Sequence, residues 1–580
     1  MTQRLGRAGL ACLVLLLAWV NASAQQVQVQ ELVLDNGMKV LLVPRKGDPN
    51  VAAGWVAKVG SVNERPGITG ISHLFEHMMF KGTRTIGTSN IEEDLKLQAR
   101  MDGVKGQIRV EEQEQLRRLR VGEIADVRDP KTRSAKHQQL LDELAALEKA
   151  QRDLLVKNEF DRVYTTAGAS GMNAGTSNDF TIFFINVPSN KLELWFWMES
   201  DRLASPVFRE FYSERDVVRE ERRLRTESTP TGRFQEEFDA MFWSASPYQW
   251  PVVGWPSDVE AITREEALAY FDLNYAPNNL TACLVGDFNV ETARQLATRY
   301  FGRLKRNPQD PPPVRTREIE PQAEKRMTAY ADTNPQAQAR YLTVANGHRD
   351  EAALDVLSSI LSGRTGRLYK SLVLDQKIAT SAGAGHNSQK WEGYFQLTAT
   401  AAPGNAPEKV EQALYKEIGK LQTTKVDARE LQKVKNQYAA DTFRRVQDNF
   451  GLMLQLLLAD NTLGWRSFNE EPAKIQAVTP DDIQRVASTY FKPERRGVIL
   501  YYTKAAPAGA VAADPLLEGL SDQERAQVTQ MRAMIQQMPV EQAKLMLQKL
   551  EQAEGQAPPE AQKTMKAIKA ILQQKIGKGE

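Results

Sequence analysis

The sequence predicts an α+β fold with two homologous halves, and three features indicate it. Two apolar runs in VQELVLDNGMKVLLVP flank Asp35, Asn36 and Gly37, which is typical of a β-hairpin. The segment AITREEALAYFDLNYAPNNLTACLV from Ala261 aligns without a gap with AVTPDDIQRVASTYFKPERRGVILY from Ala477. Each copy is typical of a threonine-capped helix followed by a proline and a strand. The composition, 42% hydrophobic and 26% charged, suits folded domains with apolar cores.

The two copies of the repeat lie before and after the proline-rich segment RNPQDPPPVRTREIEP, which is typical of a linker between domains. We expect a zinc-binding N-terminal half at residues 25–310 and a C-terminal half at residues 320–504. Each half should be an antiparallel-rich sheet with packed helices. Residues 505–580 begin with a second linker, AAPAGAVAADP, and continue as short amphipathic helices.

Residues 93–163 differ in composition from the rest of the first half. EEQEQLRRLR and QQLLDELAALEKAQRDLL carry leucine and alanine at helical spacing among many charges, and Asp129-Pro130 separates them. The pattern predicts a helical hairpin of the coiled-coil kind. Arms of roughly 30 residues would span about 45 Å. It is either a solvated insert or a lever for a partner or substrate.

The N-terminus predicts export. Arg4 and Arg7 precede an apolar run at 10–20, and Ala22-Ser23-Ala24 is a small-residue cleavage site. We expect a signal peptide at 1–24, cut after Ala24, and a periplasmic protein; an uncleaved anchor is the alternative. No later segment is apolar enough to span a membrane. The net charge of +2 offers no basic face, so a nucleic acid partner is not expected.

Two of the five histidines, His73 and His77, lie four residues apart in TGISHLFEHMMFKGT. On a helix both rings project from one face, where they can reach a common zinc ion. Glu76 borders the same face and is placed to accept a proton from water. The order H-x-x-E-H is that of the inverzincins. These residues alone leave open a helix that carries two ordinary histidines.

A catalytic zinc site needs a third protein ligand, and FYSERDVVREERRLRTE offers one. Glu214 and Glu221 are seven residues apart and nearly eclipse on a helix. Val217 and Val218 fall between them, which predicts a buried face, whereas Glu220 should point elsewhere. A carboxylate on an apolar face needs a partner, and a metal is one. We therefore expect Glu221 as the ligand and Glu214 as an auxiliary carboxylate beside the site.

Four ordered segments together resemble one known family. GISHLFEHMMFKGT, GMNAGTSNDFTIFFINVP, SERDVVREE and YAPNNLTACLVGDF are similar to the pitrilysin/insulinase family of zinc peptidases, in the branch that includes mitochondrial processing peptidase. The resemblance covers residues 32–502. It implies the metalloenzyme fold shared by LuxS and processing peptidase, and one Zn²⁺ per chain. It further implies these roles: His73, His77 and Glu221 bind zinc, Glu76 is the general base, and Asn173 and Ala174 lie on an edge strand that binds substrate.

Two positions depart from the family pattern. Glu221 follows His77 by 144 residues (221 − 77), a longer gap than is usual, and the 93–163 insert accounts for the surplus. Val373 and Thr380 occupy positions where active members place an arginine and a tyrosine over the zinc. Neither side chain stabilises an oxyanion as those two do. The resemblance therefore implies an active site shared between two subunits, of which this chain supplies the zinc ligands.

We expect a heterodimer in which a related zinc-free subunit supplies the arginine and tyrosine, with a homodimer as second choice. The expected function is that of an exported zinc endopeptidase that hydrolyses peptides or unfolded segments. The alternative is a non-catalytic peptide-binding or assembly subunit of the same fold.

Overall fold

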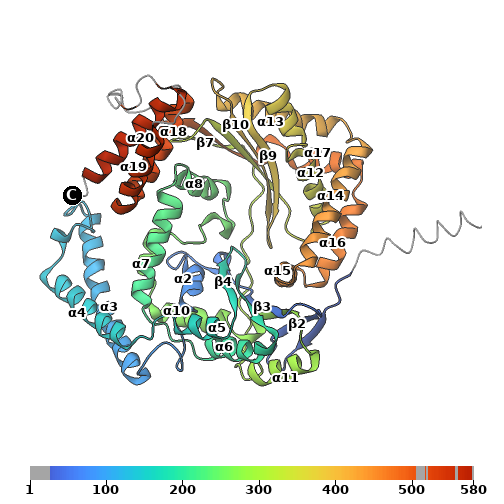
Figure 1. The fold of residues 1–580 in the computed structure, drawn as a ribbon. Helices are drawn as coiled ribbons and strands as arrows, with labels where there is room; N and C mark the ends of the chain where they lie inside the picture. Colours follow the sequence, from blue (N-terminus) through green and yellow to red (C-terminus); the bar gives the residue numbers. More distant parts are fainter. Residues whose placement is uncertain (1–25, 505–515, 517–519, 521, 555–558, 578–580) are drawn as a thin grey trace, which may run out of the picture. The chain divides into compact units, whose positions relative to one another are not determined.

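The protein is described by a computed structural model that covers residues 26–504, 516, 520, 522–554 and 559–577. The expected signal peptide at 1–24 lies outside the described residues. The chain divides into two compact units, one ending at Thr503 and one from Lys504 to Glu580. Both expected halves lie within the first unit (Figure 1).

A six-stranded sheet forms the first half, in the order β1-β2-β6-β3-β5-β4. The DNG segment is a hairpin turn: Gly37 has φ +89°, and β1 and β2 pair antiparallel on either side of it, as predicted. Only β6 runs parallel to a neighbour, β2. The strands are β1 (Gln30–Val33), β2 (Lys39–Pro44), β3 (Asn50–Ala57), β4 (Ser170–Thr176), β5 (Thr181–Pro188) and β6 (Leu280–Gly286).

Helices cover the face of this sheet toward which Ala53, Trp55 and Ala57 of β3 point. Trp55 is fully buried there with Phe75 and other apolar side chains from the helices. The helices of the first half are α2 (Ile71–Met78), α3 (Ile91–Arg120), α4 (Ala135–Leu154), α5 (Glu159–Thr166), α6 (Leu192–Ala204), α7 (Phe211–Arg222), α8 (Gly232–Phe242), α9 (Pro256–Ala261), α10 (Arg264–Asn274) and α11 (Val290–Tyr300). Of these, α8 packs on strands of the second sheet instead, through Phe238.

A five-stranded sheet forms the second half, in the order β7-β11-β8-β10-β9. Its strands are β7 (Lys325–Ala331), β8 (Gln336–Thr343), β9 (Ala379–Ser388), β10 (Gly393–Ala401) and β11 (Arg496–Thr503). Its helices are α12 (Glu351–Leu361), the π-helical turn η7 (Tyr369–Asp375), α13 (Pro407–Thr423), α14 (Ala428–Gln447), α15 (Asn449–Thr462), α16 (Arg466–Ala477) and α17 (Pro480–Tyr490).

The two halves share one topology. The order β7-β11-β8-β10-β9 repeats β2-β6-β3-β5-β4, and β11, like β6, pairs parallel with one neighbour and antiparallel with the other. The sequence repeat forms α10–β6 and α17–β11. Thr263 with Glu266 and Thr479 with Asp482 form capping boxes at the two helix starts. The predicted α+β fold with two related halves is confirmed.

One helix of the second half, α15, packs against the first sheet. Successive side chains of a strand face opposite sides, so Ala52 and Val56 of β3 point away from the first-half helices. They pack with Leu452, Met453 and Leu456 of α15, in a cluster that also buries Cys283. The first sheet is therefore covered on both faces, and the second half supplies part of the cover.

The charged segment forms two antiparallel helices of unequal length. α3 has 30 residues, whereas α4 has 20, because Ser134 caps α4 only after a loop that holds the Asp129-Pro130 turn. An apolar seam joins the helices, formed by Leu97, Met101, Val104 and Ile108 of α3 with Leu140, Leu144 and Leu147 of α4.

The second unit has its own apolar core. Val528, Ile535, Ala543 and Leu572 are buried in it. Met531, Met538 and Met546 pack on this cluster, as expected of methionine in a core. Its helices are α18 (Asp522–Gln537), α19 (Val540–Glu554) and α20 (Pro559–Gly577). Across the described parts of both units, no helix combines the length and apolarity that a membrane span needs.

Candidate metal centre

The histidine helix α2 is anchored at its first turn. Its N-cap is Gly70 at φ +89°, and a Cβ there would lie 2.6 Å from the Val253 carbonyl oxygen, so only glycine fits. The buried carboxylate of Glu64 accepts hydrogen bonds from the backbone N–H of Gly70 and Ser72, both at 2.8 Å. Burial raises the pKa of Glu64 to about 8. These bonds satisfy donors that a helix start leaves free.

The core side of α2 fixes the direction of its histidines. Leu74, Phe75 and Met78 are almost completely buried, so the opposite side carries His73 and His77, whose ring centroids lie 5.0 Å apart. Burial, with the nearby charge of His77, lowers the pKa of His73 to about 4. A neutral imidazole is the form that binds a metal.

Helix α7 brings Glu221 to the two rings. Glu221 Oε2 lies 3.3 Å from His77 Nε2 and 3.7 Å from His73 Nε2. One ligand atom from each of the three residues lies within 4.8 Å of the others. Donors at 2.0–2.1 Å from a tetrahedral zinc stand about 3.4 Å apart. The donor set and its spacing therefore fit zinc, and among the described residues this is the one such cluster of metal-binding side chains.

Glu214 lies behind His77, two helical turns before Glu221 on α7. Its Oε2 is 3.3 Å from His77 Nδ1, and its other oxygen contacts Lys81. Burial alone would raise the pKa of Glu214, but His77 and Lys81 hold it below its usual value. A carboxylate bonded to the far nitrogen of a ligand histidine fixes the ring orientation and its tautomer. The geometry thus gives Glu214 an orienting position.

The expectation that both valines of α7 lie on a buried face is wrong for one of them. Val218 is completely buried, but Val217 is 47% exposed. With 100° per residue, Val218 lies about 60° from Glu221 on one side and Val217 about 40° on the other. The two glutamates therefore stand at the border between core and solvent. Glu220 points away and pairs with Arg223.

The glutamate of the motif contacts the edge strand β4. Thr176 Oγ1 donates a 2.7 Å hydrogen bond to Glu76 Oε2. Asn173 and Ala174 lie on the same strand, and the Asn173 side chain is exposed and accepts only from the N–H of Ala174. Because β4 is the last strand of its sheet, its outer edge can accept a further strand. Its pairing with β5 is irregular between Ser170 and Asn173.

Arg225 is a residue of the site that the sequence reasoning missed. Its guanidinium Nη1 lies 2.7 Å from Glu221 Oε1, the carboxylate oxygen that faces away from the histidines. Arg225 lies in η4 (Arg223–Glu227), a π-helical turn that follows α7, and such turns are frequent at functional sites. The sequence feature that could have indicated this contact is the position of Arg225 four residues after Glu221, since residues i and i+4 are neighbours on a helix.

The remaining positions singled out from the sequence lie elsewhere. Val373 packs on the core of the second half, and Thr380 Oγ1 donates to the Thr400 carbonyl at 3.4 Å. His137 is buried in the helical insert, and His348 is partly exposed. His386 lies within strand β9, where its Nδ1 is 2.7 Å from Asp355 Oδ1.

Comparisons with known proteins agree with this geometry. The profile of Insulinase (Peptidase family M16) matches residues 39–100, which include the histidine helix, and that of the Peptidase M16 inactive domain matches residues 261–438. The chain belongs to the M16, or insulinase, family of peptidases. The zinc protease PqqE of Helicobacter pylori is 25% identical over 491 residues, which are 83% of this chain and 94% of that protein.

Solved structures of this M16 fold are similar across both halves. A protease from Helicobacter pylori has a TM-score of 0.67 at 22% identity and covers 82% of this chain and 99% of its own. The periplasmic protease PqqL from Escherichia coli has a TM-score of 0.59 at 16% identity and covers 83% of this chain and 49% of its own.

Proposed function

We propose that this protein is a zinc-dependent endopeptidase whose zinc is held by His73, His77 and Glu221. The observation that carries the proposal is the convergence of these three donors from two separate helices, at separations of 3.3 and 3.7 Å, beside Glu76. The likeness to proteins named zinc proteases supports it. One ion per chain matches the single donor cluster of the described residues.

A zinc ion held by His73, His77 and Glu221 would be a Lewis acid and would supply activation of water and polarisation of a peptide carbonyl. Glu76 accepts the proton of the attacking water and delivers it to the leaving amine. Thr176 holds one Glu76 oxygen by its 2.7 Å hydrogen bond, which leaves the other free for this exchange. Glu214 orients His77, and Arg225 occupies the Glu221 oxygen that does not face the histidines.

The substrate is an extended peptide that adds to the edge of β4. Edge strands offer free backbone N–H and C=O groups, and β-augmentation recognises the peptide backbone first. A folded protein keeps its backbone groups paired, so short peptides and unfolded segments are the substrates that fit. Asn173 and Ala174 are the contacts we assign to it, because they share this edge strand with the Glu76 partner Thr176.

In this proposal, a partner supplies the side chains that stabilise the oxyanion. Val373 and Thr380 replace the expected arginine and tyrosine, so a zinc-free subunit supplies them, or a second copy of the chain. We place the enzyme in the periplasm because the sequence of residues 1–24 has the pattern of a signal peptide.

The experiment is a cleavage assay on the purified mature chain at nanomolar concentration, with metal analysis of the same sample. We expect about one zinc per chain and weak cleavage that rises when the partner is added. Full cleavage by a monomer would refute the shared site. Zinc binding without any cleavage, even with the partner, would favour the non-catalytic peptide-binding or assembly subunit.

A further inference from the structure

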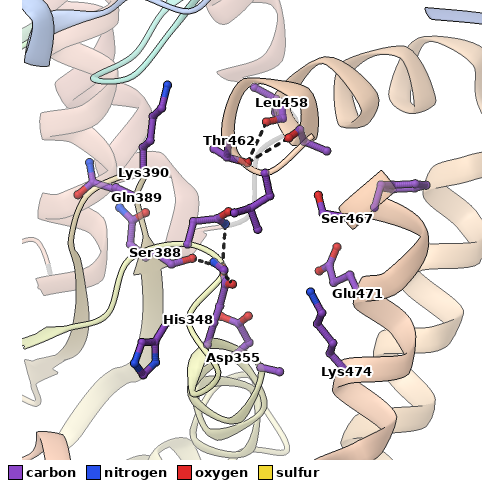
Figure 2. A pocket seen from close by; sticks show the side chains of 18 of the residues that line it. His348, Asp355, Ser388, Gln389, Lys390, Leu458, Thr462, Ser467, Glu471 and Lys474 are labelled. Atoms are coloured by element: carbon purple, nitrogen blue, oxygen red, sulfur yellow. Dashed lines mark hydrogen bonds between the residues drawn. The ribbon is translucent and has the colours of Figure 1, made fainter. Parts of the chain in front are cut away.

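Two groups of charged side chains outside the metal centre differ in their exposure to solvent. One lines a cavity of about 690 Å³ between the two halves, where Figure 2 shows Glu471 and Lys474 on the same helix. The Lys474 side chain is 53% exposed, so water can satisfy its charge. The other group lies at the base of the helical insert, where Asp94 and Arg209 are 0% and 1% exposed. Charges that are buried this completely have to be bonded by the protein itself.

Asp94 joins the two ends of the insert. It lies in the first turn of α3, and its Oδ1 accepts hydrogen bonds from the side-chain amides of Gln98, at 3.1 Å, and of Gln151 in α4, at 2.7 Å. Its Oδ2 accepts a hydrogen bond from Arg209 Nε at 2.5 Å. Gln151 Oε1 in turn accepts from the backbone N–H of Glu210 at 3.4 Å. Both helices of the insert are therefore bonded to the two residues that lead directly into α7.

The other nitrogens of Arg209 hold the segment that follows the histidine helix. Nη1 donates to the carbonyl oxygens of Lys81 and Ile86, at 3.1 and 3.0 Å, and Nη2 donates to that of Thr83 at 2.7 Å. Gly82 leaves room for the guanidinium group, because a Cβ there would lie 2.9 Å from Nη1. One side chain thus fixes the backbone that leaves α2 against the backbone that enters α7.

Lys81 extends this bonding to the metal centre. Its ammonium group contacts Glu214 and lies 3.2 Å from Glu210 Oε2. Glu214 Oε2 lies 3.3 Å from His77 Nδ1. Glu210, the cap of α7, has φ +55°, which is unfavourable for a residue other than glycine and persists only where the surrounding contacts hold it. Its bonds to Lys81 and Gln151 are such contacts.

We propose that Arg209 is a positioning residue of the metal centre and that the insert holds it in place through Asp94; this rests on the proposed zinc-dependent function. Arg209 fixes the backbone of Lys81, the Lys81 ammonium group fixes Glu214, and Glu214 orients His77. The first turn of α3 and the last turn of α4 therefore support the metal centre, whereas the outer turns of the insert do not.

The test is the zinc affinity of the full mature chain, measured by competition with a chelator beside the free energy of unfolding. Arg209→Lys keeps the charge but loses the planar fork that reaches the three carbonyl oxygens. We expect it to weaken zinc binding about tenfold, as the loss of other contacts that orient a metal ligand does. A spectrum of the Co²⁺-loaded chain should also change, because it depends on the geometry of the ligands.

A second variant, Lys81→Met, changes a partly exposed side chain, where folding is not at risk. It should weaken zinc binding by a similar factor, and Lys81→Arg should restore most of the affinity. Removal of a positive charge would by itself strengthen the binding of a cation, so a decrease reports the lost orientation. In a Glu214→Gln chain, neither Lys81→Met nor Arg209→Lys should cause a further loss, because both act through that carboxylate.

Two controls separate positioning from general stability. Ile108→Ala opens a cavity in the outer part of the insert, where Ile108 is completely buried. Glu411→Gln neutralises a buried carboxylate of the second half that pairs with Arg326 at 2.6 Å. Both should lower the free energy of unfolding and leave the zinc affinity and the Co²⁺ spectrum unchanged, whereas Asp94→Asn should alter all three.

An unchanged zinc affinity and Co²⁺ spectrum in Arg209→Lys would overturn the proposal, as would an equal loss of affinity in Glu411→Gln. A full effect of Arg209→Lys in the Glu214→Gln chain would also overturn it, because the effect would then not pass through His77. If the unaltered chain binds no zinc, the proposed function fails as well, so the two failures are distinguishable.

Discussion

The two halves of the first unit have the same five-strand order but differ in the helix that follows the second strand of the repeated unit, between β3 and β4 in the first half and between β8 and β9 in the second. In the first half this connection contains α2, which carries His73 and His77. In the second half it contains α12, where Leu354, Leu357 and Leu361 are completely buried in the core. The duplicated scaffold therefore tolerates either a pair of histidines or an apolar stripe at this place. Chemistry depends on the side chains and not on the fold.

The second half also packs against the first sheet, through α15. This helix covers the back of the first sheet, and its Asp460, with no exposed side-chain surface, pairs with Lys39 at 2.7 Å and Lys58 at 3.1 Å. Thr281 Oγ1 donates to the same carboxylate at 2.7 Å. The second half thus supports the sheet on which the candidate metal centre is built.

The largest expected effect is the loss of zinc and of cleavage when a histidine of the first half, but not one of the second half, is replaced. His73→Ala or His77→Ala should abolish zinc binding and lower cleavage by about 10³-fold or more, because a two-ligand site does not retain a catalytic metal. His348→Ala in the second half should leave both unchanged. Metal analysis and peptide cleavage of the three variants give the comparison. Zinc retained in full by His77→Ala contradicts the assignment.

A smaller effect concerns the contact between the halves. Asp460→Ala leaves two lysines without their buried partner and should cost about 3 kcal/mol in the free energy of unfolding. Burial opposes ionisation of Asp460, but Lys58, Lys39 and Thr281 keep its pKa below the usual 3.8. Its contribution is therefore present above that pH and is lost as the pH falls through the lower value. Urea unfolding measures this, with the exposed Asp441→Ala as control; equal stabilities of the two variants would count against it.

The next effect tests the contact that the π-helical turn makes with Glu221 through Arg225. Arg225→Ala frees the second oxygen of Glu221 and should weaken zinc binding about tenfold, as the loss of such supporting contacts does. Arg223→Ala, in the same turn but paired with Glu220, is the matched control. Competition with a zinc chelator gives both affinities. A loss of equal size in the two variants would show that general charge near the site, and not the contact with Glu221, is responsible.

Local patterns predicted much of this architecture. The DNG hairpin, the Thr-capped helices of the repeat and the face shared by His73 and His77 all depend on residues a few positions apart. The packing of α15 on the first sheet could not be predicted in this way, since it joins Leu452 to strands some 400 residues earlier. Val217 was misplaced because spacing alone gives the relative angles of side chains but not the direction of the core.

The central claim is that His73, His77 and Glu221 hold zinc while Glu76 transfers the proton. The most direct measurement is the zinc content and the peptide cleavage rate of Glu76→Gln beside the unaltered protein, each assayed with the partner if one is needed. The amide keeps the size of the side chain but cannot accept the proton. We predict about one zinc per chain in both proteins and a cleavage rate at least about 10³-fold lower in the variant. Undiminished cleavage by Glu76→Gln would contradict the account.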